Sequence, residues 1–200
     1  IGGSLQPLLG QYNLLEKETL VMQSELANEY GVYGFCYYHY YFEGKLLLEK
    51  PTELLLKNKD IDQKFCFCWA NHSWYRSWEG SQELLIEQRY GEESQWEKHF
   101  NYLKNFFLDE RYIKVNNKPL FCVFNGNFDC AALIYNYFDK RCKEIGFAGI
   151  HWVATWHNDK LHMPKNDQCS ALLLREPSFS MTTSFTNRVL NKFKRVFRTL

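Results

Sequence analysis

Two hydrophobic periodicities alternate along the chain. In four segments apolar side chains recur every three or four residues, the spacing of one helix face: residues 15–30, 49–58, 94–107 and 130–145. Between them lie shorter apolar runs of strand length: 31–38, 64–70, 83–88, 119–124, 149–154 and 169–174. Local signals mark some of the ends. Gly31 stops the first helix, Pro51 lies in the first turn of the second, and an Asn-Asn pair at 116–117 predicts a turn.

This alternation predicts an α/β fold in which helices cover parallel strands. A doubly wound sheet and a (β/α)₈ TIM-type barrel both fit it. Polar side chains follow nearly every predicted strand, as they do around the mouth of a barrel: His39, Asn71, His72, Glu87, Asn125, Trp156, His157, Arg175 and Glu176. A doubly wound sheet gathers its site at one crevice, and the sequence has no Gly-rich nucleotide-binding loop. We therefore expect a barrel.

The barrel is expected to be incomplete, because six predicted strands leave two unaccounted for. We assign residues 1–185 to this partial catalytic domain and residues 186–200 to a basic amphipathic helical tail. The chain begins at Ile1 rather than Met, which suggests a piece of a longer protein.

The tail has two interpretations. It contains five basic and no acidic residues, with Val189, Phe193, Val196 and Leu200 on one helical face. Such a helix can lie on an anionic membrane, which would suit an enzyme that uses lipid-linked glycans. The favoured alternative is a peripheral helix of the barrel.

Composition narrows the class of protein. The formal net charge is +1, so the chain lacks the overall positive charge that is typical of nucleic-acid-binding proteins. Aromatic residues reach 18%, which suits stacking on sugar rings, although composition alone favours an aromatic-rich core. Seven cysteines without a CxxC pair indicate reduced thiols in a cytoplasmic protein. No apolar stretch approaches the ~20 residues that span a bilayer, and no signal peptide opens the chain.

Metal and cofactor binding are not expected. Asp60-Ile61-Asp62 fits the DxD pattern that holds metal–nucleotide sugars in many transferases. It precedes the strand at 64–70, however, which places it at the opposite end of a barrel from the predicted site. His151, His157 and His162 do not have the spacing with a carboxylate that is typical of metal ligands.

Three segments resemble the WbsX family of glycosyltransferases: residues 6–15, 30–51 and 65–80. The resemblance continues through residues 84–90 and 107–121 and the Glu-Pro pair at 176–177. The family is similar to glycoside hydrolase family 99, whose members are (β/α)₈ barrels that act on α-mannosides. The resemblance implies a carbohydrate substrate, either a lipid-linked glycan or an activated sugar, and an opening barrel strand before Ile1.

Three residues are candidates for catalysis. Glu87 closes an apolar run, and its Ile-Glu-Gln-Arg-Tyr segment resembles the Ile-Glu-Pro-Tyr stretch that carries catalytic carboxylates in the hydrolase relatives. Its alternative is a surface ion pair with Arg89. Glu176 follows another predicted strand. His72 stands where the family commonly has Glu, so a carboxylate role does not carry over, but imidazole can act as an acid or base near neutral pH.

A second group is predicted to bind substrate. A loop after the strand at 64–70 combines hydrogen-bonding side chains with aromatic rings, and alternation along the first strand sends His39 and Tyr41 to one face. For Glu79, pairing with Arg76 is the alternative. The predicted substrate-binding residues are His39, Asn71, Trp74, Arg76, Trp78, Glu79 and Tyr90.

Three functions remain open at this stage. The first is a glycosyltransferase-like enzyme of surface-polysaccharide (lipopolysaccharide or capsule) synthesis. The second is a glycoside hydrolase that cleaves α-linked, mannoside-like glycans, since transfer and hydrolysis need the same carboxylates. The third is a non-catalytic glycan-binding barrel. A cytoplasmic location, with possible contact with the inner membrane face through the tail, accompanies the first.

Overall fold

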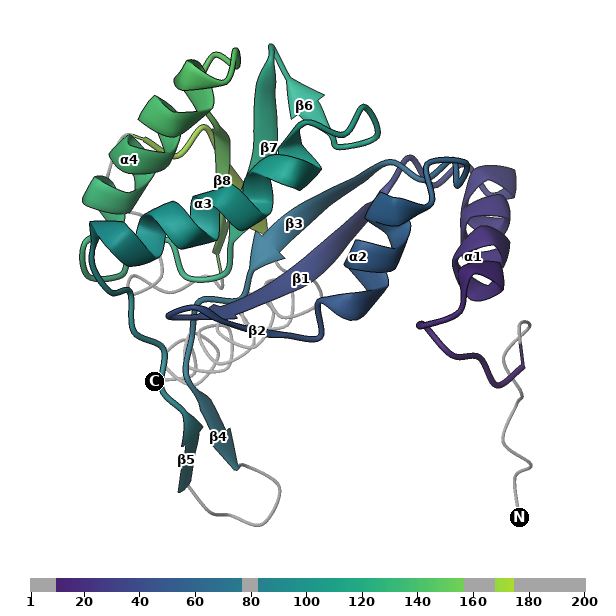
Figure 1. Cartoon of the computed structure of the whole chain (residues 1–200), viewed down its shortest axis with the longest axis horizontal. Helices are drawn as coiled ribbons and strands as arrows, with labels where there is room; N and C mark the ends of the chain where they lie inside the picture. Colours follow the sequence, from purple (N-terminus) through teal and green to yellow (C-terminus); the bar gives the residue numbers. More distant parts are fainter. Residues whose placement is uncertain (1–9, 77–82, 157–167, 175–200) are drawn as a thin grey trace, which may run out of the picture.

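The computed structural model describes residues 10–76, 83–156 and 168–174 (Figure 1). Its helices are α1 (Lys17–Glu29), α2 (Lys50–Lys57), α3 (Glu93–Phe107) and α4 (Ala131–Glu144). Its strands are β1 (Phe35–Phe42), β2 (Lys45–Leu47), β3 (Phe65–Trp69), β4 (Trp74–Arg76), β5 (Glu83–Ile86), β6 (Lys114–Val115), β7 (Lys118–Val123), β8 (His151–Trp156) and β9 (Ala171–Leu174). The four predicted helices are all present close to their expected bounds.

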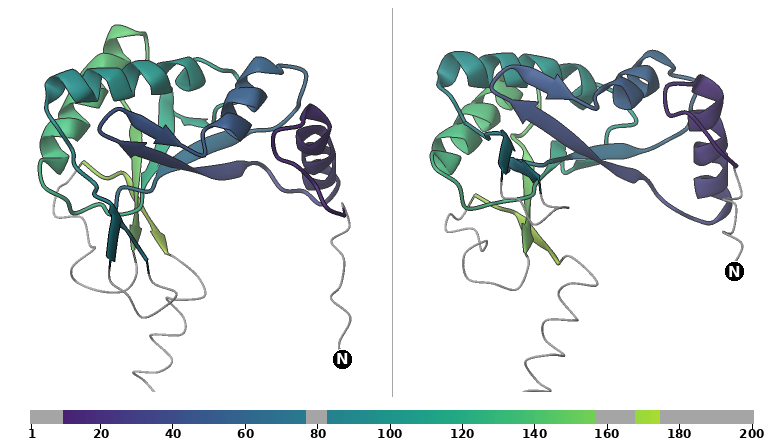
Figure 2. Two further views of the ribbon diagram at one scale, coloured as in Figure 1. Left: turned by 60° about the horizontal axis from the view of Figure 1, so that its bottom comes forward. Right: turned by 90° about the horizontal axis from the view of Figure 1, so that it is seen from below.

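The main sheet follows the order of the sequence. Its path is β2-β1-β3-β7-β8-β9, and every neighbouring pair from β1 to β9 is parallel. Helices α2, α3 and α4 lie on the same face of it (Figure 2). A doubly wound sheet would reverse its strand order and carry helices on both faces. The fold is therefore a mixed α/β fold with a parallel sheet, but the described strands do not close into a barrel, since β2 and β9 form its two ends.

The prediction for residues 83–88 is wrong in one respect. Strand β5 pairs antiparallel with β4 in a separate two-stranded sheet rather than joining the parallel sheet. Parallel neighbours need a long crossover, usually a helix, and no described helix separates β3 from β5. The apolar side chains of Leu84 and Leu85 are accordingly 47% and 42% exposed instead of buried.

The two faces of the main sheet differ in composition. On β3, Phe67 and Trp69 point to the helices, where their rings meet those of Phe106 and His99 at 4.9 Å each. The intervening cysteines, Cys66 and Cys68, belong to the other face because successive side chains alternate along a strand. The helix-covered face is the main hydrophobic core. We call the opposite face the open face.

A buried ion pair connects α2 to the sheet. Arg111 is 7% exposed and forms a salt bridge of 2.9 Å with Asp109. The guanidinium also donates to the carbonyl oxygens of Leu55, Asn58 and Ile61, at and beyond the last turn of α2. The Leu55 carbonyl belongs to the last turn of α2, whose carbonyls lack a partner within the helix. Arg111 therefore satisfies the Leu55 carbonyl and adds a second donor to those of Asn58 and Ile61.

The same segment fixes the start of the β3–β7 pairing. The Tyr112 hydroxyl donates to the Leu120 carbonyl and accepts from the Phe67 amide, so it joins the two strands where their ladder begins. Asn116 and Asn117, with φ of 50° and 57°, form the predicted two-residue turn between β6 and β7. The segment at 107–121, which resembles the WbsX family, therefore helps to hold the sheet together.

Candidate functional site

Two loops are tied together where β3 and β7 end. The Asn71 side-chain amide donates to the Asn125 carbonyl oxygen, and its Oδ1 accepts from the Asn125 amide, both at 2.8 Å. Asn71 is 1% exposed. The prediction that Asn71 contacts substrate is therefore corrected. Its side chain is buried and occupied by backbone, and it positions these loops.

The β4–β5 hairpin returns the chain to the same place. The Gln88 amide donates to Ser73 Oγ at 2.9 Å, and the Tyr90 hydroxyl donates to the Asn71 carbonyl at 3.0 Å. Burial raises the pKa of Tyr90, so this hydroxyl stays protonated and available as a donor. Glu87, next to Gln88, thus reaches the carboxyl end of β3 through the hairpin rather than at the end of a parallel strand.

Glu87 is exposed and carries an ion pair. Its carboxylate accepts from Arg89, with 2.7 Å between Oε2 and the nearer guanidinium nitrogen. The side chains of Glu87 and Arg89 are 50% and 66% exposed, so solvent weakens the pair and leaves the carboxylate accessible. The pair that was the alternative interpretation is present, and it does not exclude proton transfer by Glu87.

Aromatic rings gather on the open face at the same end. Tyr38 and Tyr40 project from β1 with centroids 6.2 Å apart, and Tyr40 meets the edge of Trp74 at 5.1 Å. Tyr38 lies 6.4 Å from Phe124, and Phe124 lies 4.7 Å from the exposed His72 ring. We call these five residues the aromatic surface. Tyr38 is 48% exposed, which leaves it free to stack on a sugar ring.

The prediction that His39 lines the site is wrong. His39 and Tyr41 do share a face of β1, but it is the helix-covered face, and His39 is 4% exposed. Its Nε2 lies 2.8 Å from Nε2 of His99 on α3, so one ring donates a hydrogen bond to the other. The sequence did not single out His99. Tyr38 and Tyr40, one residue to either side of His39, face the candidate site instead.

The His39–His99 pair should make stability depend on pH. Burial lowers the pKa of His39 to about 3 and the pKa of His99 well below its ordinary value. Both folded pKa values lie below the unfolded value of about 6.5, so the contribution is complete above that pH and is lost as pH falls. The expected loss is about 1.4 kcal/mol per pH unit for each histidine.

Urea denaturation at pH 7.5 and 5.5 measures this effect. The free energy of unfolding should fall by roughly 2–3 kcal/mol between the two pH values. A double variant, His39→Phe with His99→Phe, should lose most of that dependence. His151→Asn, on the half-buried His151 of β8, serves as the control and should retain it. An unchanged pH dependence in the double variant would contradict the assignment.

The remaining predicted residues are placed only in part. Arg76 pairs across the hairpin with Glu83 at 3.2 Å. Trp78, Glu79 and Glu176 lie outside the described residues, as does the tail at 186–200. Asp60 of the DxD pattern pairs with Lys17 at 2.6 Å, before the start of β3 and away from the candidate site. Potential metal ligands gather on the open face instead, where three cysteines lie together.

Comparison with known proteins gives the class and then the family. The solved structure of a protein described as "Glycoside hydrolase-like protein" matches with a TM-score of 0.58 at 11% identity, covering 90% of this chain and 58% of that one. The fold is therefore shared with a glycoside hydrolase-like protein. The family profile described as "Glycosyltransferase WbsX" matches residues 5–199. The chain belongs to the WbsX glycosyltransferase family, a family of carbohydrate-active proteins.

Two curated relatives come from Xanthomonas campestris pv. campestris, strains B100 and ATCC 33913. Each is described as "Uncharacterized protein WxcX" and is 32% identical over 149 residues, 72% of this chain. The match spans only 21% of the length of each relative.

Proposed function

We propose that this chain contributes the carbohydrate site of a glycosyltransferase-like enzyme of surface-polysaccharide synthesis. The aromatic surface is the single observation that carries this proposal. It combines the exposed Tyr38 and its neighbour Tyr40 from β1 with Trp74 at the start of β4, Phe124 directly after β7 and the His72 imidazole. All five lie on one face at the carboxyl ends of parallel strands. Sites of barrel and open α/β enzymes form at this end.

Chemistry is assigned to groups beside this surface. Glycosyl transfer passes through an oxocarbenium-like state and needs a carboxylate that exchanges a proton at the attacking or leaving oxygen. Glu87 fits that role, because it is exposed and its segment is hydrogen-bonded to Ser73, between His72 and Trp74. On the family resemblance, the proposal also keeps Glu176 as a second catalytic carboxylate and Trp78 and Glu79 as substrate-binding residues.

The proposed whole is a (β/α) barrel. Support comes from parallel strands that follow one another in sequence order, with helices on one face. The open face would then become the barrel interior, and the aromatic surface would line its mouth. Additional strands would pair with the sheet ends.

The proposed substrate of the transfer reaction, whether donor or acceptor, is an activated sugar or a lipid-linked glycan. Peripheral membrane contact through residues 186–200 remains a prediction. In the described part of the chain, no helix has the length and apolar character needed to cross a bilayer.

Two other functions compete with transfer. A hydrolase would use the same carboxylate and aromatic surface, and the glycoside hydrolase-like fold favours it. A non-catalytic glycan-binding protein is favoured by His72, which replaces the family's usual Glu. The three differ in what happens to a bound sugar: transfer to an acceptor hydroxyl, release into water, or no reaction.

Tyr38→Ala tests the proposed sugar surface. Covering roughly 60 Å² of the ring by a sugar face contributes ~1.5 kcal/mol, so oligosaccharide affinity of the full-length protein should fall about ten-fold. Tyr33→Ala is the matched control, because Tyr33 is 72% exposed but precedes β1 at the other end of the sheet. Equal affinities of Tyr38→Ala and wild type, measured by calorimetry with polysaccharide fragments, would remove the surface from the site.

A further inference from the structure

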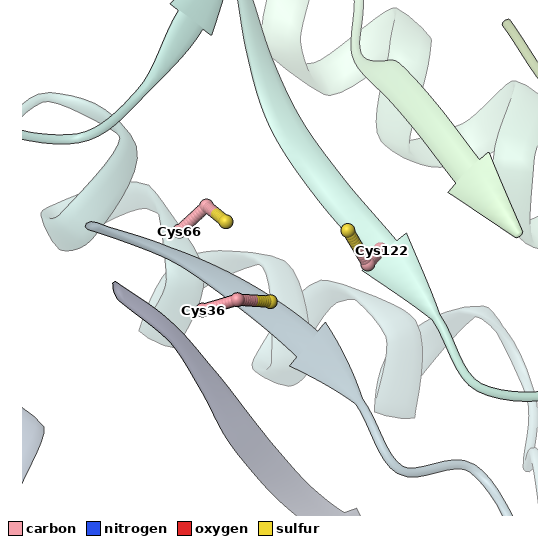
Figure 3. Close-up of side chains that lie close together, drawn as sticks. All are labelled: Cys36, Cys66 and Cys122. Atoms are coloured by element: carbon pink, nitrogen blue, oxygen red, sulfur yellow. The ribbon is translucent and has the colours of Figure 1, made fainter. Parts of the chain in front are cut away.

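Three cysteines from three adjacent strands converge on the open face (Figure 3). Cys36 of β1 lies opposite Cys66 of β3, while Cys122 of β7 lies opposite Cys68 of β3. Directly paired residues share a face of the sheet, and Cys66 and Cys68 are two positions apart, so all four thiols belong to one face. The Sγ atoms of Cys36, Cys66 and Cys122 all lie within 4.8 Å of one another.

This spacing is close to that of a metal–thiolate site. Sulfur bound to zinc lies about 2.3 Å from the ion, which puts two tetrahedral ligands ~3.8 Å apart. Small rotations of the thiol groups would bring the three sulfurs to that separation. Thiolates select soft ions such as Zn²⁺ and Cu⁺ over Mg²⁺ or Ca²⁺.

Access from solvent also suits a metal. Cys66 and Cys122 are 5% and 4% exposed, whereas Cys36 is exposed and opens the cluster to solvent.

We propose that Cys36, Cys66 and Cys122 bind one thiophilic metal ion, Zn²⁺ or Cu⁺, with Cys68 next to the remaining coordination position. Each sulfur that binds the ion gives any proton it carries to water, and no electron is transferred. The ion would clamp β1, β3 and β7 together between the levels of Cys66 and Cys68, where the direct β3–β7 ladder begins. The cluster adjoins the aromatic surface, since Cys68 pairs directly with Tyr38, but no residue of that surface is among the proposed metal ligands, so this proposal does not depend on carbohydrate binding.

Metal titration of the reduced protein tests the site. The chelator-treated protein is titrated without oxygen with Cd²⁺, whose thiolate charge-transfer band reports sulfur binding directly. We expect the band to saturate at one ion per chain. Competition by Zn²⁺, and a separate Cu⁺ titration against a Cu⁺ chelator, distinguish the two physiological ions.

Cys36→Ser is the decisive variant, since Cys36 is exposed and its replacement leaves the core intact. It should weaken Cd²⁺ binding by more than about 100-fold, beyond the 10–100-fold that loss of an outer-shell partner costs. It should also abolish the rise in melting temperature that Zn²⁺ causes in the wild type. Cys130→Ser, at a free cysteine outside the cluster, is the control and should behave as wild type.

Two results would overturn the proposal. One is the absence of a saturating band in the wild type. The other is wild-type affinity in Cys36→Ser, which decides the matter even if Cys66→Ser and Cys122→Ser fail to fold.

Discussion

Glu87→Gln is expected to lower turnover by the full-length protein by roughly two to four orders of magnitude, the usual worth of a general acid or base. Glutamine keeps the shape of the side chain and can still hydrogen-bond to Arg89, but it cannot exchange a proton. Affinity for the glycan should change far less, because the aromatic surface supplies most of the proposed contact. Initial rates and equilibrium binding, measured on the same preparations, separate the two effects.

The turnover measurement on Glu87→Gln has a matched control. Glu110→Gln changes another exposed glutamate, which precedes β7 at the opposite end of the sheet, and it should leave turnover unchanged. Undiminished turnover in Glu87→Gln would remove Glu87 from the chemistry. A wild-type protein that binds glycan but never transfers or hydrolyses it would favour the non-catalytic function.

Arg111→Ala is expected to lower the free energy of unfolding by about 3–5 kcal/mol, the cost of removing one partner from a buried ion pair. The change leaves the Asp109 carboxylate, whose side chain is 2% exposed, without the guanidinium it faces. Burial by itself would raise the pKa of Asp109, yet hydrogen bonds from Arg111 and Lys59 hold it below its ordinary value. The Leu55 carbonyl also loses the guanidinium donor.

Urea denaturation at pH 7 measures this loss. Lys17→Ala is the control. It removes the Lys17–Asp60 surface ion pair before the start of β3, whose side chains are 39% and 63% exposed, and it should leave the midpoint nearly unchanged. Arg111→Lys keeps the charge but cannot reproduce the forked contacts, so it should recover only part of the stability. A midpoint for Arg111→Ala equal to that of the wild type would contradict the structural role assigned to this pair.

The four helices and most strands of the parallel sheet were predictable because their causes are local. The first strand, predicted at 31–38, lies instead at Phe35–Phe42, and the short strands β2, β4 and β6 were not predicted. The 3.6-residue spacing of α3 and the apolar run of β3 each determine an element without reference to the rest of the chain. Parallel pairing could also be predicted from the sequence, since amphipathic helices between apolar strands provide the crossovers that parallel strands need. The segment of β5 shows the limit of this argument, because four apolar-rich residues fit a short hairpin strand as well as a parallel one.

The candidate site depended on information that the sequence does not contain. Side chains alternate along a strand, so His39 and Tyr38 must lie on opposite faces of β1. The alternation does not say which of these faces the helices cover. The contact between His39 and His99 on α3 shows that it is the face of His39. Asn71 was correctly located at a strand end, yet only its bonds to Asn125 show that its amide is already occupied.

By itself, the sequence determined the four helices, most strands of the parallel sheet, their alternation and the family, since these follow from residue types at short or fixed spacing. Tertiary structure alone decided which side chains meet. Cys36, Cys66 and Cys122 are far apart along the chain, and they come together because β1, β3 and β7 are neighbours in one register. Glu87 reaches the end of β3 because a hairpin folds back on Ser73. Such contacts arise from strand order and register, which are set by the packing of the whole sheet.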